Sequence, residues 1–440
     1  MSDAAIGLAA IGVLALVLAL RMPVAVALLA VGGTGYAMVV GVDPLFAHLR
    51  KSSFYRFANY DFSIIPLFLL MGYLAVQARI SADLYVAARA LVGHIRGGLA
   101  LATLGACAAF GAIAGSSVAT AAAMCQVALP EMRKAGYDAA LTTGTLAAGG
   151  TLGILIPPSI VLAVYGLLTE SNIGTLFIAA IVPGLLAVLG YAIVVAVVVR
   201  RDPAAGPAGA RAGPGEVLPA LLRAWPMLLI ALVVVVGIYG GFFTPTEAAA
   251  VATIITLVLA LVRSQGRWRE LVSSFHGAAT MTGMIFLIVL GADLFNAFLA
   301  FTGLPMLLAE TLAKTQWSPL WLLVAMLAMY LVLGTFMDSM AMVLLTLPML
   351  LPTLKAMDFG LGPDATLIWI GILVLVAVEV GMISPPFGLN LFVLKAAAPE
   401  VPMRAIYRGV VPFIVSDLLR IALLVAFPSL SLALVRALGP

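Results

Sequence analysis

The chain has 440 residues, of which 64% are hydrophobic and 10% are charged, and its formal net charge is +4. Soluble domains carry about 25% charged residues, so this composition excludes a soluble protein and indicates a polytopic integral membrane protein. The basic residues lie in loops, where they serve membrane topology and do not indicate a nucleic-acid partner. Cys107 and Cys125 lie in apolar or small-residue stretches, which predicts packing roles and no disulfide.

The first half of the chain is predicted to contain five crossings and one re-entrant hairpin. An apolar run of roughly 20 residues is long enough to cross the hydrocarbon core as a helix. The hairpin is the segment 98–133, which is too long for one crossing and too short for two. An amphipathic segment at 83–98 is predicted to lie on the cytoplasmic surface. The predicted crossings are 4–20, 23–42, 61–78, 138–168 and 173–199.

The second half is predicted to follow a flexible Pro/Gly/Ala-rich linker, residues 203–219. A second re-entrant hairpin is predicted at 318–354. Placing the basic loops 200–223 and 263–269 in the cytoplasm follows the positive-inside rule and leaves both termini outside. The predicted crossings are 224–241, 243–262, 271–302, 364–394 and 408–435.

Two of these crossings carry a double proline, GILIPP at 153–158 and GMISPP at 381–386. Proline lacks an N–H group and clashes with the preceding turn, so each pair should break its helix. The breaking residues are Pro157, Pro158, Pro385 and Pro386. Irregular backbone at membrane depth is tolerated only where it is buried in protein or lines a wet cavity. Each break frees carbonyls that can coordinate a cation and presents a half-helix N-terminus suited to an anion.

The two halves share landmarks at nearly constant spacing. MPVAVALLA resembles TPTEAAAVA 222 positions later, GSSVATAAAMCQVALP resembles GTFMDSMAMVLLTLP with its last proline 218 positions on, and the two breaks are 228 positions apart. An odd number of crossings separates the first pair, so the second half should be inverted in the membrane. Inverted repeats with discontinuous helices are typical of secondary transporters. We therefore expect one repeat at 1–205, a cytoplasmic linker at 206–223 and a second repeat at 224–440.

Four stretches occur in the order GAIAGSSVATAAAM, TTGTLAAGGTLGILIPPSIVLAVYG, FFTPTEAAAVA and GMISPPFGLN. With them, the chain resembles the large membrane subunit (the DctM-like permease) of TRAP, or tripartite ATP-independent periplasmic, transporters from about residue 20 to 430. The resemblance implies an all-α, elevator-type fold with two inverted repeats, two re-entrant hairpins and two discontinuous helices. It implies import of an organic acid, such as a C4-dicarboxylate, across the bacterial inner membrane, with Na⁺ as coupling ion and no cofactor. It also implies two partners, a separate small four-helix membrane subunit and a periplasmic substrate-binding protein.

Sodium ligands are expected at the hairpin tips. Ser116 and Ser117 lie at the first tip, where their hydroxyls could bind Na⁺ or, at Ser116, substrate; small residues there could also serve only close packing. Asp338 and Thr335 lie at the second tip, and a carboxylate at membrane depth by default marks a functional site. The alternative is that Asp338 is a structural acid bonded to backbone donors.

The breaks complete the expected site. Freed carbonyls near Gly153 and Gly381 are predicted to join the sodium ligands. Ser159, Ser384 and Asn390 flank the breaks and could contact substrate carboxylates, although many serines in membrane helices only bond their own backbone.

Three further ionisable residues allow less definite predictions. The first hairpin has no acid at the place matched to Asp338, where Thr120 and Ala121 lie, so the two ion sites should differ. Glu379 precedes the second break and could ligate an ion, relay a proton or brace the broken helix. Asp417 and Arg420 are three residues apart, face the same way and are predicted to form a structural pair.

Two other functions are weighed against a tripartite importer. A membrane enzyme would need a catalytic constellation, but His48, His94 and His276 form no H-x-x-x-H pattern, and no GxSxG or phosphate-binding loop occurs. A stand-alone sodium- or proton-coupled di- or tricarboxylate symporter would use the same hairpins and breaks, so it stays open as the alternative.

Overall fold

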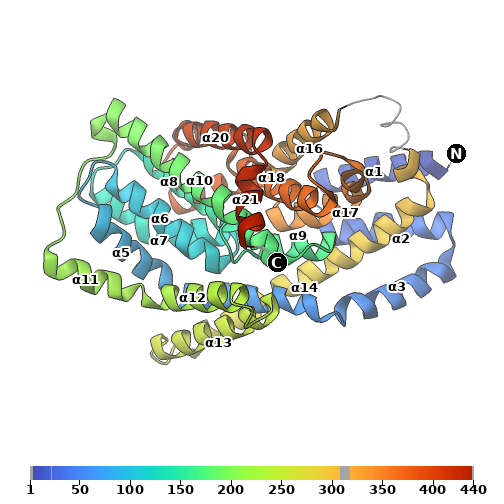
Figure 1. The fold of residues 1–440 in the computed structure, drawn as a ribbon, viewed down its shortest axis with the longest axis horizontal. Coiled ribbons are helices and arrows are strands. Elements are labelled where there is room, and N and C mark those ends of the chain that lie inside the picture. Colours follow the sequence, from blue (N-terminus) through green and yellow to red (C-terminus); the bar gives the residue numbers. More distant parts are fainter. Residues whose placement is uncertain (1–2, 21, 308–317, 439–440) are drawn as a thin grey trace.

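The protein's structure, a computed structural model, describes residues 3–20, 22–307 and 318–438 (Figure 1). Within these residues it consists of helices and contains no strand, which confirms the predicted all-α fold class. Six described helices are long and apolar enough to cross a membrane singly, and two bent pairs raise that number to eight. Shorter apolar helices, including the first two, account for further predicted segments.

The first helices gather at one end of the molecule (Figure 1, right). Gly32 lets α2 lie directly on α14, because a Cβ atom there would be 2.9 Å from the Cα of Phe295. A polar helix that the sequence analysis did not predict, α3, follows α2, and His48 on α3 lies 3.1 Å from the Asp293 carboxylate of α14. The elements are α1 (Asp3–Ala19), α2 (Val24–Val39), α3 (Val42–Phe57), a 3₁₀ turn (Tyr60–Ser63), α4 (Ile64–Gln77), α5 (Ile80–Val92) and α14 (Trp268–Phe301).

The first hairpin and the first broken helix occur where the sequence predicts them. Two helices joined at 115–116 form the hairpin, and the helix after it stops at 155 and restarts at 160. The two halves of the broken helix are bent by 40°. The elements are α6 (Gly98–Ala114), α7 (Ser117–Lys134), α8 (Ala139–Leu155), α9 (Ile160–Thr169) and α10 (Ile173–Arg201).

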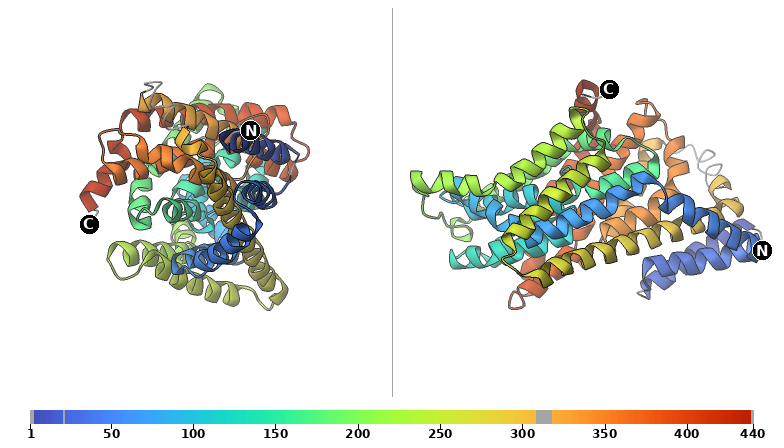
Figure 2. Two further views of the ribbon diagram at one scale, coloured as in Figure 1. Left: turned by 90° about the vertical axis from the view of Figure 1, so that its right-hand side faces the viewer. Right: turned by 90° about the horizontal axis from the view of Figure 1, so that it is seen from below.

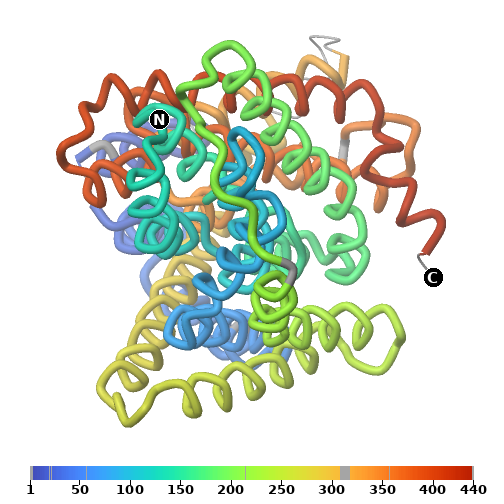
Figure 3. Tube along the Cα trace, turned by 90° about the vertical axis from the view of Figure 1, so that its left-hand side faces the viewer, coloured from blue at the N-terminus to red at the C-terminus, as the bar shows by residue number. Residues whose placement is uncertain are grey.

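The linker between the halves is more ordered than predicted. Gly97 donates its N–H to the Gly206 carbonyl at 2.9 Å, and Gly209 donates to Gly93 at 3.1 Å, so the segment is fastened across the start of the hairpin (Figure 3). Residues 214–223, within the linker predicted at 206–223, form a helix. The elements are a 3₁₀ turn (Pro203–Ala205), α11 (Pro214–Arg223), α12 (Trp225–Tyr239) and α13 (Pro245–Arg263).

The second half contains the second hairpin and the second broken helix at the predicted places. The last predicted crossing, 408–435, is wrong in its extent, because one helix ends at Ala426 and another begins at Ser429. Pro428 lacks an N–H group and disfavours helical backbone at Phe427, which adopts φ −129° and ψ 78°. The elements are α16 (Pro319–Gly334), α17 (Ser339–Ala356), α18 (Pro363–Ile383), α19 (Leu389–Ala397), α20 (Met403–Ala426) and α21 (Ser429–Leu438).

Helix α18 forms the centre of the bundle. Its apolar span is buried along its whole length, and it packs against α8 and α10 from the first half and α16 and α20 from the second. Figure 2 shows helices of both halves interleaved around it. The two halves therefore share one core, against which the first break packs with Pro158 and Ser159 buried, whereas Pro385, Pro386 and Phe387 of the second break are exposed at its surface.

Candidate transport site

Each hairpin meets a broken helix at a pair of glycines. A Cβ atom on Gly111 of α6 would lie 2.4 Å from the Cα of Gly153 on α8. A Cβ atom on Gly334 of α16 would lie 2.9 Å from the Cα of Gly381 on α18. Real Cβ atoms do not approach so closely, so only glycine allows these backbone contacts. Gly153 and Gly381, both predicted site residues, thus lie where hairpin and break touch.

The first hairpin tip reaches both breaks. Gly115 adopts a left-handed φ of 59°, and a Cβ atom there would lie 2.6 Å from Ile160, at the start of α9. The Ser116 hydroxyl caps α7 by accepting the N–H of Ala119 at 3.3 Å. The buried Ser117 hydroxyl donates to the sulfur of Met382, just before the second break, at 3.2 Å. The first tip therefore lies against the start of α9 and against Met382, the residue of α18 that closely precedes the second break.

The first break holds its serine in backbone hydrogen bonds. The Pro157–Pro158 peptide bond is cis. The Ser159 hydroxyl donates to the Ile154 carbonyl and accepts the N–H of Leu162. Ser159 is fully buried at this cap, and its hydroxyl already has two backbone partners.

At the second tip, Asp338 is the N-cap of α17 and accepts the N–H of Met340 at 3.0 Å. Thr335 donates its hydroxyl to the Val332 carbonyl at 2.8 Å. The rings of Phe336 and Phe387 pack with their centroids 4.9 Å apart and their planes tilted by 38°, which joins the tip to the break. This tip therefore brings a carboxylate and an aromatic contact to the second break.

The second break resembles the first in two respects. It contains a cis peptide bond, Pro385–Pro386, and a serine whose hydroxyl donates to the backbone. Ser384 donates its hydroxyl to the Val380 carbonyl at 2.7 Å. On the two sides of this break, Met382 and Asn390 both reach into the first half of the chain, Met382 at Ser117 and Asn390 at Ala147.

Asn390 joins the second break to α8. Its side-chain amide donates to the Ala147 carbonyl at 3.2 Å, while its Oδ1 atom has no partner among the described residues. A Cβ atom on Gly150 would lie 3.2 Å from both the Asn390 amide nitrogen and the Ser117 carbonyl. Ser117, Asn390 and bare α8 backbone therefore converge, and they come from both halves of the chain.

The sequence analysis matched Asp338 to the wrong position. Asp338 caps α17 as Ser116 caps α7, and these residues are 222 positions apart, the same spacing as the first repeat landmark. The earlier match to Thr120 and Ala121 relied on prolines near the far ends of the hairpins, where the two halves differ by four positions. The two tips thus pair a serine with a carboxylate.

Thr120 is a candidate ligand that the sequence analysis did not propose. Its side chain is fully buried, and its hydroxyl has no hydrogen-bond partner among the described residues. The hydroxyl would lie 3.5 Å from a Cβ atom on Gly111, beside the first glycine contact. The sequence signal that could have identified Thr120 is its spacing: it follows Ser116 by one helical turn, on the same face of α7.

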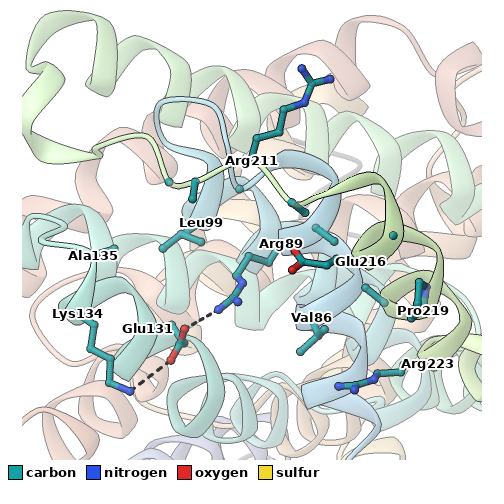
Figure 4. A pocket seen from close by; sticks show the side chains of 17 residues that line it. Val86, Arg89, Leu99, Glu131, Lys134, Ala135, Arg211, Glu216, Pro219 and Arg223 are labelled. Carbon is teal, nitrogen blue, oxygen red and sulfur yellow. Dashed lines mark hydrogen bonds and ion pairs between the residues drawn. The ribbon is translucent and has the colours of Figure 1, made fainter.

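A surface cavity of about 670 Å³ lies elsewhere, between α5, α7 and α11 (Figure 4). Glu131 binds Arg89 at 2.6 Å and Lys134 at 3.5 Å there, and all three side chains are at least one-third exposed. Glu131 is 14 residues from Ser117 on α7, a rise of about 21 Å. This surface cavity is therefore separate from the breaks.

Two broken helices inside a bundle, each met by a hairpin, define a polytopic secondary transporter. Residues 11–430 match the family described as "Tripartite ATP-independent periplasmic transporter, DctM component". The chain belongs to this family, whose members are large permease subunits in the inner membrane.

Several relatives carry names from this family. The chain is 38% identical to a C4-dicarboxylate TRAP transporter large permease protein of Pseudomonas aeruginosa, covering 87% of each chain. It is 32% identical to an ectoine TRAP large permease of Halomonas elongata, over 92% of this chain and 90% of the relative. It is 31% identical to a sialic acid TRAP large permease of Vibrio cholerae, over 86% of each chain. The fold is similar to the YdaH transporter of Alcanivorax borkumensis, with a TM-score of 0.60, 17% identity and coverage of 91% and 90%.

Proposed function

We propose that this permease imports an organic acid, a C4-dicarboxylate or related carboxylate, in symport with sodium. The observation that carries the proposal is the meeting of each hairpin with a broken helix at a glycine pair, which brings hairpin backbone to within a few residues of the point where that helix is interrupted. Unwound carbonyls at such breaks are the usual Na⁺ ligands of transporters built from inverted repeats. The choice of acid rests on the C4-dicarboxylate relative, since other relatives are named for ectoine and sialic acid.

The proposed coupling of uptake to sodium would use two sodium sites of different composition. At the first, the carbonyls around Gly153 would be joined by the unpartnered Thr120 hydroxyl and by Ser116 and Ser117. At the second, the carbonyls around Gly381 would be joined by Asp338 and Thr335. Only the second site contains a carboxylate, so it should bind sodium more tightly.

The substrate would lie between these sites. No arginine lies within either break motif, so its carboxylates would be held by half-helix N-termini, bound sodium and neutral polar groups. Those groups are Ser116, Ser159, Ser384 and Asn390. Asn390 is the best placed, because its side-chain NH₂ group has two N–H donors and uses one of them on the Ala147 carbonyl of α8, which leaves the other for a carboxylate.

Transport would follow an elevator movement. The hairpins and broken helices would slide as one body past a scaffold of α1–α4 and α12–α14. The permease would act with a small four-helix membrane subunit and a periplasmic substrate-binding protein. The family's description as a tripartite periplasmic transporter supports the presence of two further components.

The test is uptake of labelled succinate into proteoliposomes that contain this chain and its small subunit, with purified binding protein outside. We expect uptake to require inward sodium and the binding protein, and to collapse in Asp338→Ala. Asp364→Ala, an exposed carboxylate at the start of α18, is the matched control and should transport normally. Sodium-driven uptake without the binding protein would identify a stand-alone symporter, and proton-driven uptake without sodium would refute the sodium assignment.

A further inference from the structure

Arg420 is a buried cation between two carboxylates. It lies on α20, and its side chain is 4% exposed. Its Nη2 atom is 2.8 Å from Oε2 of Glu379 on α18 and 2.9 Å from Oδ1 of Asp417 on α20. Both carboxylate side chains are at most 1% exposed. The predicted Asp417–Arg420 pair is therefore part of a larger group.

The group continues to the first broken helix. Tyr191 on α10 donates its hydroxyl to Oδ2 of Asp417 at 2.6 Å. The same hydroxyl is 3.3 Å from the hydroxyl of Thr151 on α8. Helix α18, which carries Glu379, packs directly against α8. The contacts thus form a ring through α8, α10, α20 and α18, which we call the buried polar ring.

The ring joins equivalent positions of the two halves. Thr151 lies two residues before Gly153, and Glu379 lies two residues before Gly381, so each immediately precedes a hairpin contact. α10 and α20 each follow a broken helix, and they touch where a Cβ atom on Gly190 would lie 2.5 Å from the Ser416 hydroxyl. The ring therefore lies where the two halves cross.

Packing alone does not explain these buried charges. An apolar set of the same volume is often as stabilising as a buried ion group, because desolvation offsets much of the attraction. Directional hydrogen bonds differ from apolar contacts in that they define a single register between helices. The register defined here is that of α8 against α18, the two helices that end at the breaks.

We propose that Arg420 is a positioning residue, which holds the two breaks in one register. In that register, a cation bound at one hairpin site raises the cation affinity of the other. Arg420 binds Glu379 on the second break directly and reaches the first through Asp417, Tyr191 and Thr151. The coupling between ion sites rests on the proposed sodium symport; the register between α8 and α18 does not.

Two substitutions cut the ring on opposite sides of Arg420. Glu379→Leu detaches α18 and leaves the neutral Asp417–Arg420 pair, and Tyr191→Phe detaches α10 and α8. Glu379→Gln can still accept from Arg420 and should behave as wild type. Tyr137→Phe is the matched control, because Tyr137 is a buried tyrosine whose hydroxyl accepts the Leu99 N–H outside the ring.

The first readout is the sodium dependence of succinate uptake in the reconstituted transporter. We expect a Hill coefficient near 2 in wild type and near 1 in the two cut variants, with half-saturating sodium raised at least about fivefold, the lower range of measured couplings between sites. Maximal uptake at saturating sodium should change less than about twofold. Unchanged cooperativity in both cut variants, even with lower thermal stability, would overturn the coupling.

The second readout needs neither uptake nor sodium coupling. Spin labels at the exposed positions Glu170, after α9, and Ala396, on α19, report the placement of the two broken helices. We expect a narrow distance distribution in wild type and Glu379→Gln, and a broad one in Glu379→Leu and Tyr191→Phe. Sodium-independent uptake by the wild type would refute the proposed symport, and the spin-label distances would then test the positioning role alone. Equal distance distributions in all variants would refute the positioning role.

Discussion

At the residue scale, a single methyl group is enough to disturb the contact between hairpin and break. Gly153→Ala would place its Cβ atom 2.6 Å from the Cα of Gly111, so the two backbones must separate. We expect a loss of about 1–3 kcal/mol of unfolding free energy, as for other overpacked cores, together with loss of uptake. The buried Cys107 and Cys125 can report unfolding, because a thiol-reactive dye reaches them only when the core opens.

The control for this substitution lies on the hairpin that Gly153 contacts. A Cβ atom on Gly105 of α6 would meet no atom within 4 Å. Gly105→Ala should therefore leave uptake unchanged and stability equal or slightly higher, since alanine favours helix more than glycine does. Equal behaviour of the two variants would contradict the role given to the glycine contact.

Single residues also show where sequence reasoning stops. The Asp417–Arg420 pair was predictable because residues three apart share a helix face, and the structure confirms it. Glu379 binds the same arginine from 41 positions away, and only the packing of α18 on α20 decides that partner. Ser159 and Ser384 were recognisable as polar residues at breaks, but their backbone bonds depend on the local geometry of those breaks.

At the element scale, burial separates two arginine–carboxylate contacts of similar length. Arg89 links α5 to α7 with its side chain 49% exposed, and Arg420 links α20 to α18 with 4% exposed. We expect Arg89→Gln to lower the unfolding free energy by about 0–1 kcal/mol and Arg420→Gln by about 3–5 kcal/mol, since the latter leaves uncompensated buried carboxylates. Thermal unfolding of both variants in one detergent would measure this, and similar losses would contradict the argument.

The elements best predicted were those with a strong local cause. Double prolines located both breaks, and segment length located both hairpins. Helix α3 was missed because it is polar, and α11 was missed because its proline and glycine content is typical of a linker. The last crossing was drawn too long because a lone proline, Pro428, was overlooked within an apolar run.

At the scale of the whole molecule, the two proposed sodium sites would fix the charge moved in each cycle. Two sodium ions neutralise a dicarboxylate, so succinate accumulation should not respond to membrane potential set with potassium and valinomycin. A monocarboxylate would carry one net positive charge, worth roughly 2.3 kcal/mol per 100 mV, and should accumulate about tenfold more per 60 mV. Succinate accumulation that rises with potential would instead require a third cation.

The glycine pairs also determine how the permease could be re-engineered for another cargo. Libraries that vary the hairpin arms would mostly yield chains that cannot close at Gly111–Gly153 or Gly334–Gly381. Asn390, on α19, lies on the other side of the second break from that contact, and exchanging it leaves both backbone approaches intact. A designer should therefore keep all four glycines fixed and place diversity at the far side of the breaks.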